Sequence, residues 1–88
     1  ILFCQAHSNY CMIHFVNKRK KIASKTLKDI EAQLADFSFF RTHQSYLINL
    51  NYVKEIRKSD NSSLILSDDT SIPITKLKRL ELIELMNT

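Results

Sequence analysis

Glycine is absent from this 88-residue sequence, and proline occurs once. Tight turns that need a positive φ must therefore use Asn, Asp or Ser, and residues 60–63 and 67–69 are the candidates. Cysteine occurs twice, without the dense spacing of a disulfide-stapled domain, which favours a reducing, cytoplasmic setting. No apolar run approaches the roughly 20 residues that a membrane-spanning helix needs, so we expect no membrane association.

The length and composition predict one globular domain. Hydrophobic residues make up 44% and charged residues 25% of the chain, as in ordinary soluble proteins, and the length suffices for a single modest core. The chain begins in an apolar stretch rather than with Met, and this stretch lacks the basic start of a signal peptide. We therefore take residues 1–88 as one domain excised from a longer protein, with an N-terminal neighbour missing.

Short apolar and alternating runs predict a mostly β structure. The expected strands are residues 1–4, 10–16, 22–23, 37–43, 52–58, 63–67 and 71–74. Residues 7–9 are the expected turn after the first strand, 17–21 read as a polar loop, and 45–50 fit either a helical turn or a strand. Pro73 cannot donate a hydrogen bond to a neighbouring strand, which predicts that its strand lies at a sheet edge.

Two helices are predicted, each with a threonine at its start. In residues 26–37 apolar side chains recur at helical spacing behind Thr26, at Leu27, Ile30 and Leu34. Residues 75–86 form the second helix behind Thr75, and the side chains expected to face inward there are Leu77, Leu80, Ile83 and Met86.

The charges of the second helix run against its dipole. Lys76, Lys78 and Arg79 fall in the first turn, and Glu81 and Glu84 follow. A helix N-terminus carries about half a positive charge, so cations there are unfavourable for stability. Exposed amides beside three cations suit an anion such as a nucleic-acid phosphate. The alternative is a set of solvent-screened surface charges with no ligand.

A polar cluster, residues 41–45, interrupts the apolar frame formed by residues 39–40 and 47–56. Arg and Gln side chains can read base edges in the major groove, and Ser and Thr hydroxyls suit phosphate. We therefore interpret Arg41 and Gln44 as ligand-contacting residues. For His43 the alternative is a polar niche in the core, and for Ser45 a cap on the following turn.

The stretch FFRTHQSYLINLNYV resembles the LytTR DNA-binding domain, the output module of many bacterial response regulators. The family pattern Phe-x-Arg-x-His-x-Ser-(Tyr/Phe) falls on residues 39–46, and the likeness extends over nearly the whole chain. It implies a mostly β fold with one or two helices, an elongated α+β structure of short antiparallel sheets. It also implies that loops, rather than a recognition helix, contact DNA.

The resemblance assigns three DNA-facing segments. The loop before the second strand holds His7, Ser8, Asn9 and Tyr10; the Arg-x-His-x-Ser loop holds Gln44; and the last hairpin-to-helix junction holds Lys76. The predicted base contacts are Asn9, Gln44 and Lys76. The predicted backbone contacts or loop supports are His7, Ser8, Tyr10, Arg41, His43, Ser45, Lys78 and Arg79. Lys76 lacks the planar fork of Arg, Gln44 favours adenine over guanine, and Ser8 and Asp69 replace the family's turn glycines.

Other kinds of site fit the sequence less well. Two Cys/His pairs, Cys4 with His7 and Cys11 with His14, suggest zinc, but residues three apart on a strand point to opposite faces. His43 and Ser45 lack a nucleophile elbow, which argues against an enzyme. Three tyrosines could stack RNA bases, but no RNP aromatic pair is visible. A protein-interaction or regulatory domain that keeps the same fold without binding DNA is the alternative that stays open.

The sequence therefore predicts a sequence-specific DNA-binding domain of a bacterial transcription regulator in a two-component phosphorelay. We expect it to read the major groove of double-stranded DNA from loops and to bind as a pair on adjacent DNA repeats. We also expect a receiver domain in the full-length chain and a cytoplasmic location. No cofactor and no metal are expected.

Overall fold

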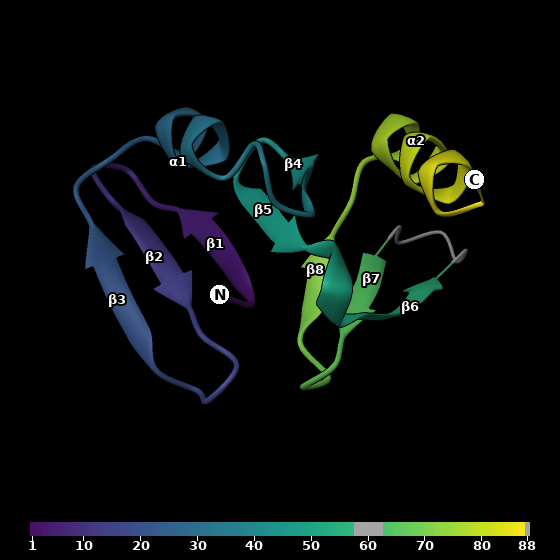
Figure 1. Ribbon diagram of the computed structural model, residues 1–88, viewed down its shortest axis with the longest axis horizontal. Helices are drawn as coiled ribbons and strands as arrows, with labels where there is room; N and C mark the ends of the chain where they lie inside the picture. Colours follow the sequence, from purple (N-terminus) through teal and green to yellow (C-terminus); the bar gives the residue numbers. More distant parts are fainter. Residues whose placement is uncertain (58–62, 88) are drawn as a thin grey trace.

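The computed structural model describes residues 1–57 and 63–87, and its strands form two antiparallel sheets (Figure 1). The five-stranded sheet has the order β3-β2-β1-β5-β4. Its strands are β1 (Phe3–Ala6), β2 (Cys11–His14), β3 (Lys20–Ala23), β4 (Phe39–His43) and β5 (Tyr46–Asn49). The three-stranded sheet has the order β6-β7-β8, with β6 (Val53–Arg57), β7 (Ser63–Leu66) and β8 (Ser71–Pro73).

Helices cover both sheets. The helix α1 (Leu27–Gln33) lies over the five-stranded sheet, and α2 (Lys76–Met86) lies at the far end beside the small sheet (Figure 1). A single 3₁₀ turn among the described residues, η1 (Leu50–Tyr52), links β5 to β6. The molecule measures 33 × 24 × 24 Å, so it is moderately elongated, as the family resemblance implied.

The central strands of the five-stranded sheet bury side chains on both faces, because side chains alternate along each strand, whereas the edge strand β3 is mostly exposed. On one face Cys4, Cys11 and Leu47 pack with Leu27 and Ile30 of α1. On the other face a second cluster joins the sheet to the small sheet and α2; its buried members are Leu2, Phe3, Ile48, Leu64, Leu66, Ile72, Ile74 and Leu82. The three layers therefore share one central sheet, and this sheet fixes the positions of the turns at its ends.

The first helix is capped as predicted but ends early. The Thr26 side chain accepts a hydrogen bond from the Asp29 amide at 3.1 Å. The helix ends at Gln33 rather than at residue 37, because the chain tightens into three-residue turns with Ala35 N–H donating to Ala32 O and Phe37 N–H to Leu34 O. The shorter helix lets Phe39 enter β4 at once.

The second helix is also capped as predicted, but its inward face was predicted wrongly. Leu82 is fully buried, whereas Leu77 and Leu80 are 68% and 54% exposed. Met86, also expected inside, is 49% exposed, and Ile83 is half-buried. The side turned to the core carries Lys78, Arg79, Leu82 and Ile83, because the backbone contact of the exposed cap Thr75 with β4 fixes how the helix starts.

Most strand predictions are confirmed, with changes at the boundaries. Residues 45–50 resolve into β5 followed by the 3₁₀ turn, β3 begins at Lys20 rather than at Ile22, and Pro73 lies in the edge strand β8 as expected. Asp69 takes a positive φ of 69° in the β7–β8 turn, as we predicted for residues 67–69 from the absence of glycine. Lys18 also has φ 69°, which was not expected, and Ser8 does not enter this region. Residues 58–62 lie outside the described part of the chain.

Candidate nucleic-acid interface

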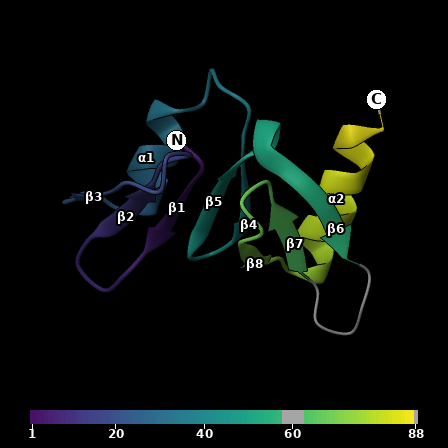
Figure 2. The same ribbon diagram turned by 90° about the horizontal axis from the view of Figure 1, so that it is seen from below.

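Three segments that are distant in the sequence meet on one side of the molecule. The Ala6 amide donates to Ser45 O at 2.8 Å, so the β1–β2 turn and the β4–β5 turn share one end of the five-stranded sheet. The Thr75 amide donates to Thr42 O at 3.1 Å, which holds the start of α2 beside the same end of β4. Figure 2 shows both turns and the start of α2 in a row along its lower edge.

The β1–β2 turn, residues 7–10, closes by a backbone hydrogen bond from His7 N–H to Tyr10 O at 2.8 Å. The rings of His7 and Tyr10 stack with their centroids 4.9 Å apart, which stiffens the turn from the side. Ser8 and Asn9 lie at the exposed tip. The turn therefore presents Asn9 to solvent on a short, braced loop.

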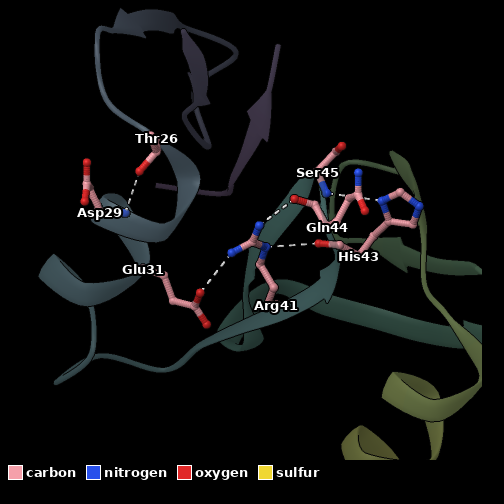
Figure 3. Close-up of polar contacts among 7 residues, drawn as sticks. All are labelled: Thr26, Asp29, Glu31, Arg41, His43, Gln44 and Ser45. Carbon is pink, nitrogen blue, oxygen red and sulfur yellow. Dashed lines mark hydrogen bonds and ion pairs between the residues drawn. The ribbon is translucent and has the colours of Figure 1, made fainter. Parts of the chain in front are cut away.

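The β4–β5 turn is held by Arg41, whose guanidinium folds back over it (Figure 3). Arg41 Nε donates to His43 O at 3.1 Å, and Nη2 donates to Gln44 O. The remaining nitrogen of the guanidinium, Nη1, donates to Glu31 Oε1 in α1 at 3.0 Å. The pairing of β4 with β5 shifts register between Arg41 and His43, so the ladder is irregular just before the turn.

Within the same turn, His43 braces Ser45. The Ser45 amide donates to His43 Nδ1 at 3.2 Å, so this ring nitrogen is the acceptor of the contact (Figure 3). The contact involves the backbone of Ser45 and not its hydroxyl, which gives no support to nucleophile chemistry. Gln44 is exposed, and its side-chain amide makes no hydrogen bond within the described residues. The turn therefore leaves the Gln44 amide available for an outside partner.

The start of α2 carries its three cations in different environments. The Thr75 side chain accepts from the Lys78 amide at 3.2 Å, and the first turn contains no acidic residue. Lys76 is exposed. Lys78 lies over the Phe40 ring, with Nζ 5.6 Å from the centroid, and Nζ is 3.4 Å from the Glu81 carboxylate. Arg79 is half-buried, and its Nε has no hydrogen-bond partner within the described residues.

The three segments thus lie on one side of the molecule, and each contributes one exposed residue to the predicted base contacts: Asn9, Gln44 and Lys76. It commits Arg41 to three contacts inside the protein, which is the geometry of a loop support rather than of a free phosphate ligand. Sequence reasoning missed Glu31, because nothing in the pattern of α1 links it to a residue ten positions later in a different element.

The two cysteines and their neighbouring histidines do not converge. Cys4 and Cys11 are buried in the cluster under α1, whereas His14 stacks on Phe3 at 4.1 Å in register with the opposite cluster. The described residues contain no group of three or more His, Cys, Asp or Glu side chains placed to hold a metal ion. Within the same residues, neither helix is long and apolar enough to cross a membrane.

The LytTr DNA-binding domain family matches residues 1–87. The sensory transduction protein LytT of Bacillus subtilis is 39% identical over 66 residues, which are 73% of this chain and 27% of that protein. The heme-containing CO-sensing transcriptional regulator RcoM 1 of Paraburkholderia xenovorans is 29% identical over 68 residues, which are 74% of this chain and 26% of that protein.

A solved structure shares the fold. The LytTr DNA-binding domain of a methyl-accepting/DNA response regulator from Bacillus cereus superposes with a TM-score of 0.84 at 18% identity, covering all of this chain and 82% of that one. The chain spans about a quarter of the length of the two curated relatives. With a match over residues 1–87, the chain belongs to the LytTr DNA-binding domain family.

Proposed function

We propose that this domain reads duplex DNA sequence-specifically through its three gathered segments, as the output domain of a bacterial transcription regulator. The observation that carries the proposal is the row formed by the β1–β2 turn, the β4–β5 turn and the start of α2 (Figure 2). Long-range backbone hydrogen bonds hold these segments in place before any ligand arrives, so little ordering entropy is lost on binding.

The three exposed tips supply the side chains for base recognition. Asn9 and Gln44 carry amides that pair bidentately with the N6 and N7 edge of adenine in the major groove. Lys76 can donate to O6 or N7 of guanine as a point charge, without the planar fork of Arg. The proposed site therefore reads two adenine-type positions and one weaker guanine-type position.

Phosphate contacts fall to the residues around these tips. We assign them to His7, Ser8, Tyr10, His43, Ser45, Lys78 and Arg79, and Arg41 supports the loop from inside. A cluster of cations beside helix amides neutralises phosphates and releases counterions, so binding should weaken steeply with salt. Arg79 is half-buried in the first turn of α2, and we assign it a phosphate contact together with the rest of this set.

We extend the proposal to the longer protein and to its arrangement on DNA, as the family resemblance implies. The domain binds as a pair on adjacent DNA repeats, a receiver domain in the longer chain transmits a phosphorelay signal, and the protein acts in the cytoplasm. LytT is named as a sensory transduction protein and RcoM 1 as a heme-containing sensor. These names describe different kinds of sensor, so we infer that proteins with this type of domain differ in their sensory part. The receiver domain is therefore the first part of the proposal to check, and the full-length sequence checks it.

The experiment begins with selection of bound duplexes from a random pool, followed by affinity titrations across a salt series. A site using about five to eight phosphates should lose affinity by orders of magnitude between low and moderate salt. Gln44→Ala should relax one base position, whereas Arg79→Ala should weaken binding to all sequences. Lys18→Ala is the matched control, since Lys18 lies in the β2–β3 turn at the opposite end of β2. Unchanged affinity in both Gln44→Ala and Lys76→Ala would remove the proposed site.

A protein-interaction domain without DNA binding is the second candidate. It is favoured by Leu77 and Leu80, which expose 68% and 54% of their surface on one side of α2. Failure of the selection to enrich any duplex, together with no retention of random DNA even at low salt, would favour this candidate over the first.

A further inference from the structure

Arg41 connects α1, which is not one of the three segments proposed to contact DNA, to the β4–β5 turn, which is one of them. Its guanidinium contacts two carbonyl oxygens of the β4–β5 turn, at His43 and Gln44, and the Glu31 carboxylate of α1 (Figure 3). The side chain of Arg41 is 24% exposed and that of Glu31 46%. The pair is therefore partly shielded from water, where a charge-assisted hydrogen bond is stronger than at a fully exposed site.

The geometry of the guanidinium makes Glu31 important for the two other contacts. The guanidinium group is planar and rigid, so fixing Nη1 on the carboxylate also fixes the directions of Nε and Nη2. Those two nitrogens hold the consecutive carbonyls of His43 and Gln44, where the chain leaves β4 and enters the turn. Without Glu31, the Arg41 side chain would regain rotamer freedom and hold the carbonyls for a smaller fraction of the time.

We propose that Glu31 is a positioning residue for the DNA-reading turn, acting through Arg41 to preorganise Gln44. This inference rests on the proposed function. For removal of Glu31, it predicts a change in DNA affinity opposite in sign to the change that simple electrostatics predicts. Removing a carboxylate from a protein that binds DNA reduces charge repulsion and should tighten binding. Loss of positioning should instead weaken binding, because the turn must then be ordered when DNA arrives.

A matched pair of variants separates the two effects. Glu31→Ala removes the carboxylate that contacts Arg41. Asp29→Ala removes a carboxylate from the same helix two residues earlier, and that carboxylate has no ion pair within the described residues. We expect Glu31→Ala to bind the selected duplex about three- to tenfold more weakly and Asp29→Ala to bind it equally or more tightly. Equal or tighter binding by Glu31→Ala would overturn the inference.

A double-mutant cycle tests whether Glu31 acts through Arg41. In an Arg41→Ala background, Glu31→Ala should cause no further loss of affinity, because the side chain it positions is gone. Glu31→Gln should recover part of the affinity, since its side-chain oxygen can still accept from Nη1. Additive losses from the two substitutions would show independent roles and contradict the proposal.

A measurement on the free protein keeps this inference separate from the proposed function. The Ser45 amide bonds to the His43 ring inside the turn, so its hydrogen exchange reports the order of the turn. Glu31→Ala should speed exchange at Ser45 at a temperature where unfolding curves show the variant to be folded, and Asp29→Ala should not. Unchanged exchange would reject the positioning role even if the wild-type domain binds DNA, whereas faster exchange in a protein that binds no DNA would reject the proposed function alone.

Discussion

The backbone amide of Thr75 donates to the carbonyl oxygen of Thr42 at 3.1 Å, across 33 residues of sequence. Thr42 is fully buried in β4, one residue before His43, and Thr75 is the residue that caps α2. This bond and the contact of Lys78 with the Phe40 ring place the first turn of α2 beside β4 and the turn that follows it. The relative positions of Gln44 and Lys76 therefore depend on the sheet rather than on either loop alone.

The Thr75 cap gives a prediction for stability. Its side-chain oxygen accepts from the Lys78 amide at 3.2 Å. Thr75→Val keeps the shape and the backbone amide but loses this acceptor, so we expect a loss of about 1 kcal/mol in unfolding free energy. Thr75→Ser keeps the oxygen and serves as the control. Urea denaturation of both variants measures the difference, and equal stabilities would contradict the capping role.

The orientation of α2 can be tested with one pair of leucines. Leu82 is fully buried in the main cluster, whereas Leu80 is 54% exposed. Leu82→Ala should lower the unfolding free energy by about 2–5 kcal/mol, the range for a buried leucine, and Leu80→Ala by less than about 1 kcal/mol. The same denaturation experiment ranks them. A larger loss for Leu80→Ala would mean that the helix presents its other face to the core.

His14 should make the fold sensitive to acid. Burial lowers its pKa below the ordinary value of 6.5, and Lys20 and His7 lower it further while Asp68 opposes them. The ring also has a buried Nε2 without a partner in the described residues. Below about pH 6.5 the unfolded chain therefore binds a proton that the folded protein resists, so stability should fall as the pH falls.

The variant His14→Phe tests this pH effect, because it keeps an aromatic ring to stack on Phe3 and removes the titrating group. Denaturation curves between about pH 7.5 and pH 5 should show a smaller decline for the variant than for the wild type. Identical slopes would assign the acid sensitivity to other groups.

The two cysteines should resist alkylation while the protein is folded. Burial raises the pKa of Cys4 to about 11, with a further contribution from Cys11, and burial also raises the pKa of Cys11. Since the thiolate is the reactive form, both thiols should react slowly with iodoacetamide at neutral pH and rapidly once the chain is unfolded. Mass spectrometry of samples with and without denaturant measures this. Fast labelling of the native protein would contradict the burial of this cluster.

Much of the fold follows from local patterns. The two threonine caps, the edge position of Pro73 and the positive φ of Asp69 were all predicted from sequence, because capping, the missing proline N–H and turn geometry act within a few residues. The inward face of α2 was not, since apolar residues occur on several sides of that helix and the contact with β4 selects among them.

The candidate site divides in the same way. The sequence by itself determined the family motif around residues 39–46 and the residue types offered at the three tips, because these are properties of short segments. Only the tertiary structure decided that the three segments share one side and that Glu31 meets Arg41. Both results come from hydrogen bonds between different elements of the fold, and these elements are placed by the pairing of β1 with β5 and by packing on both faces of the central sheet.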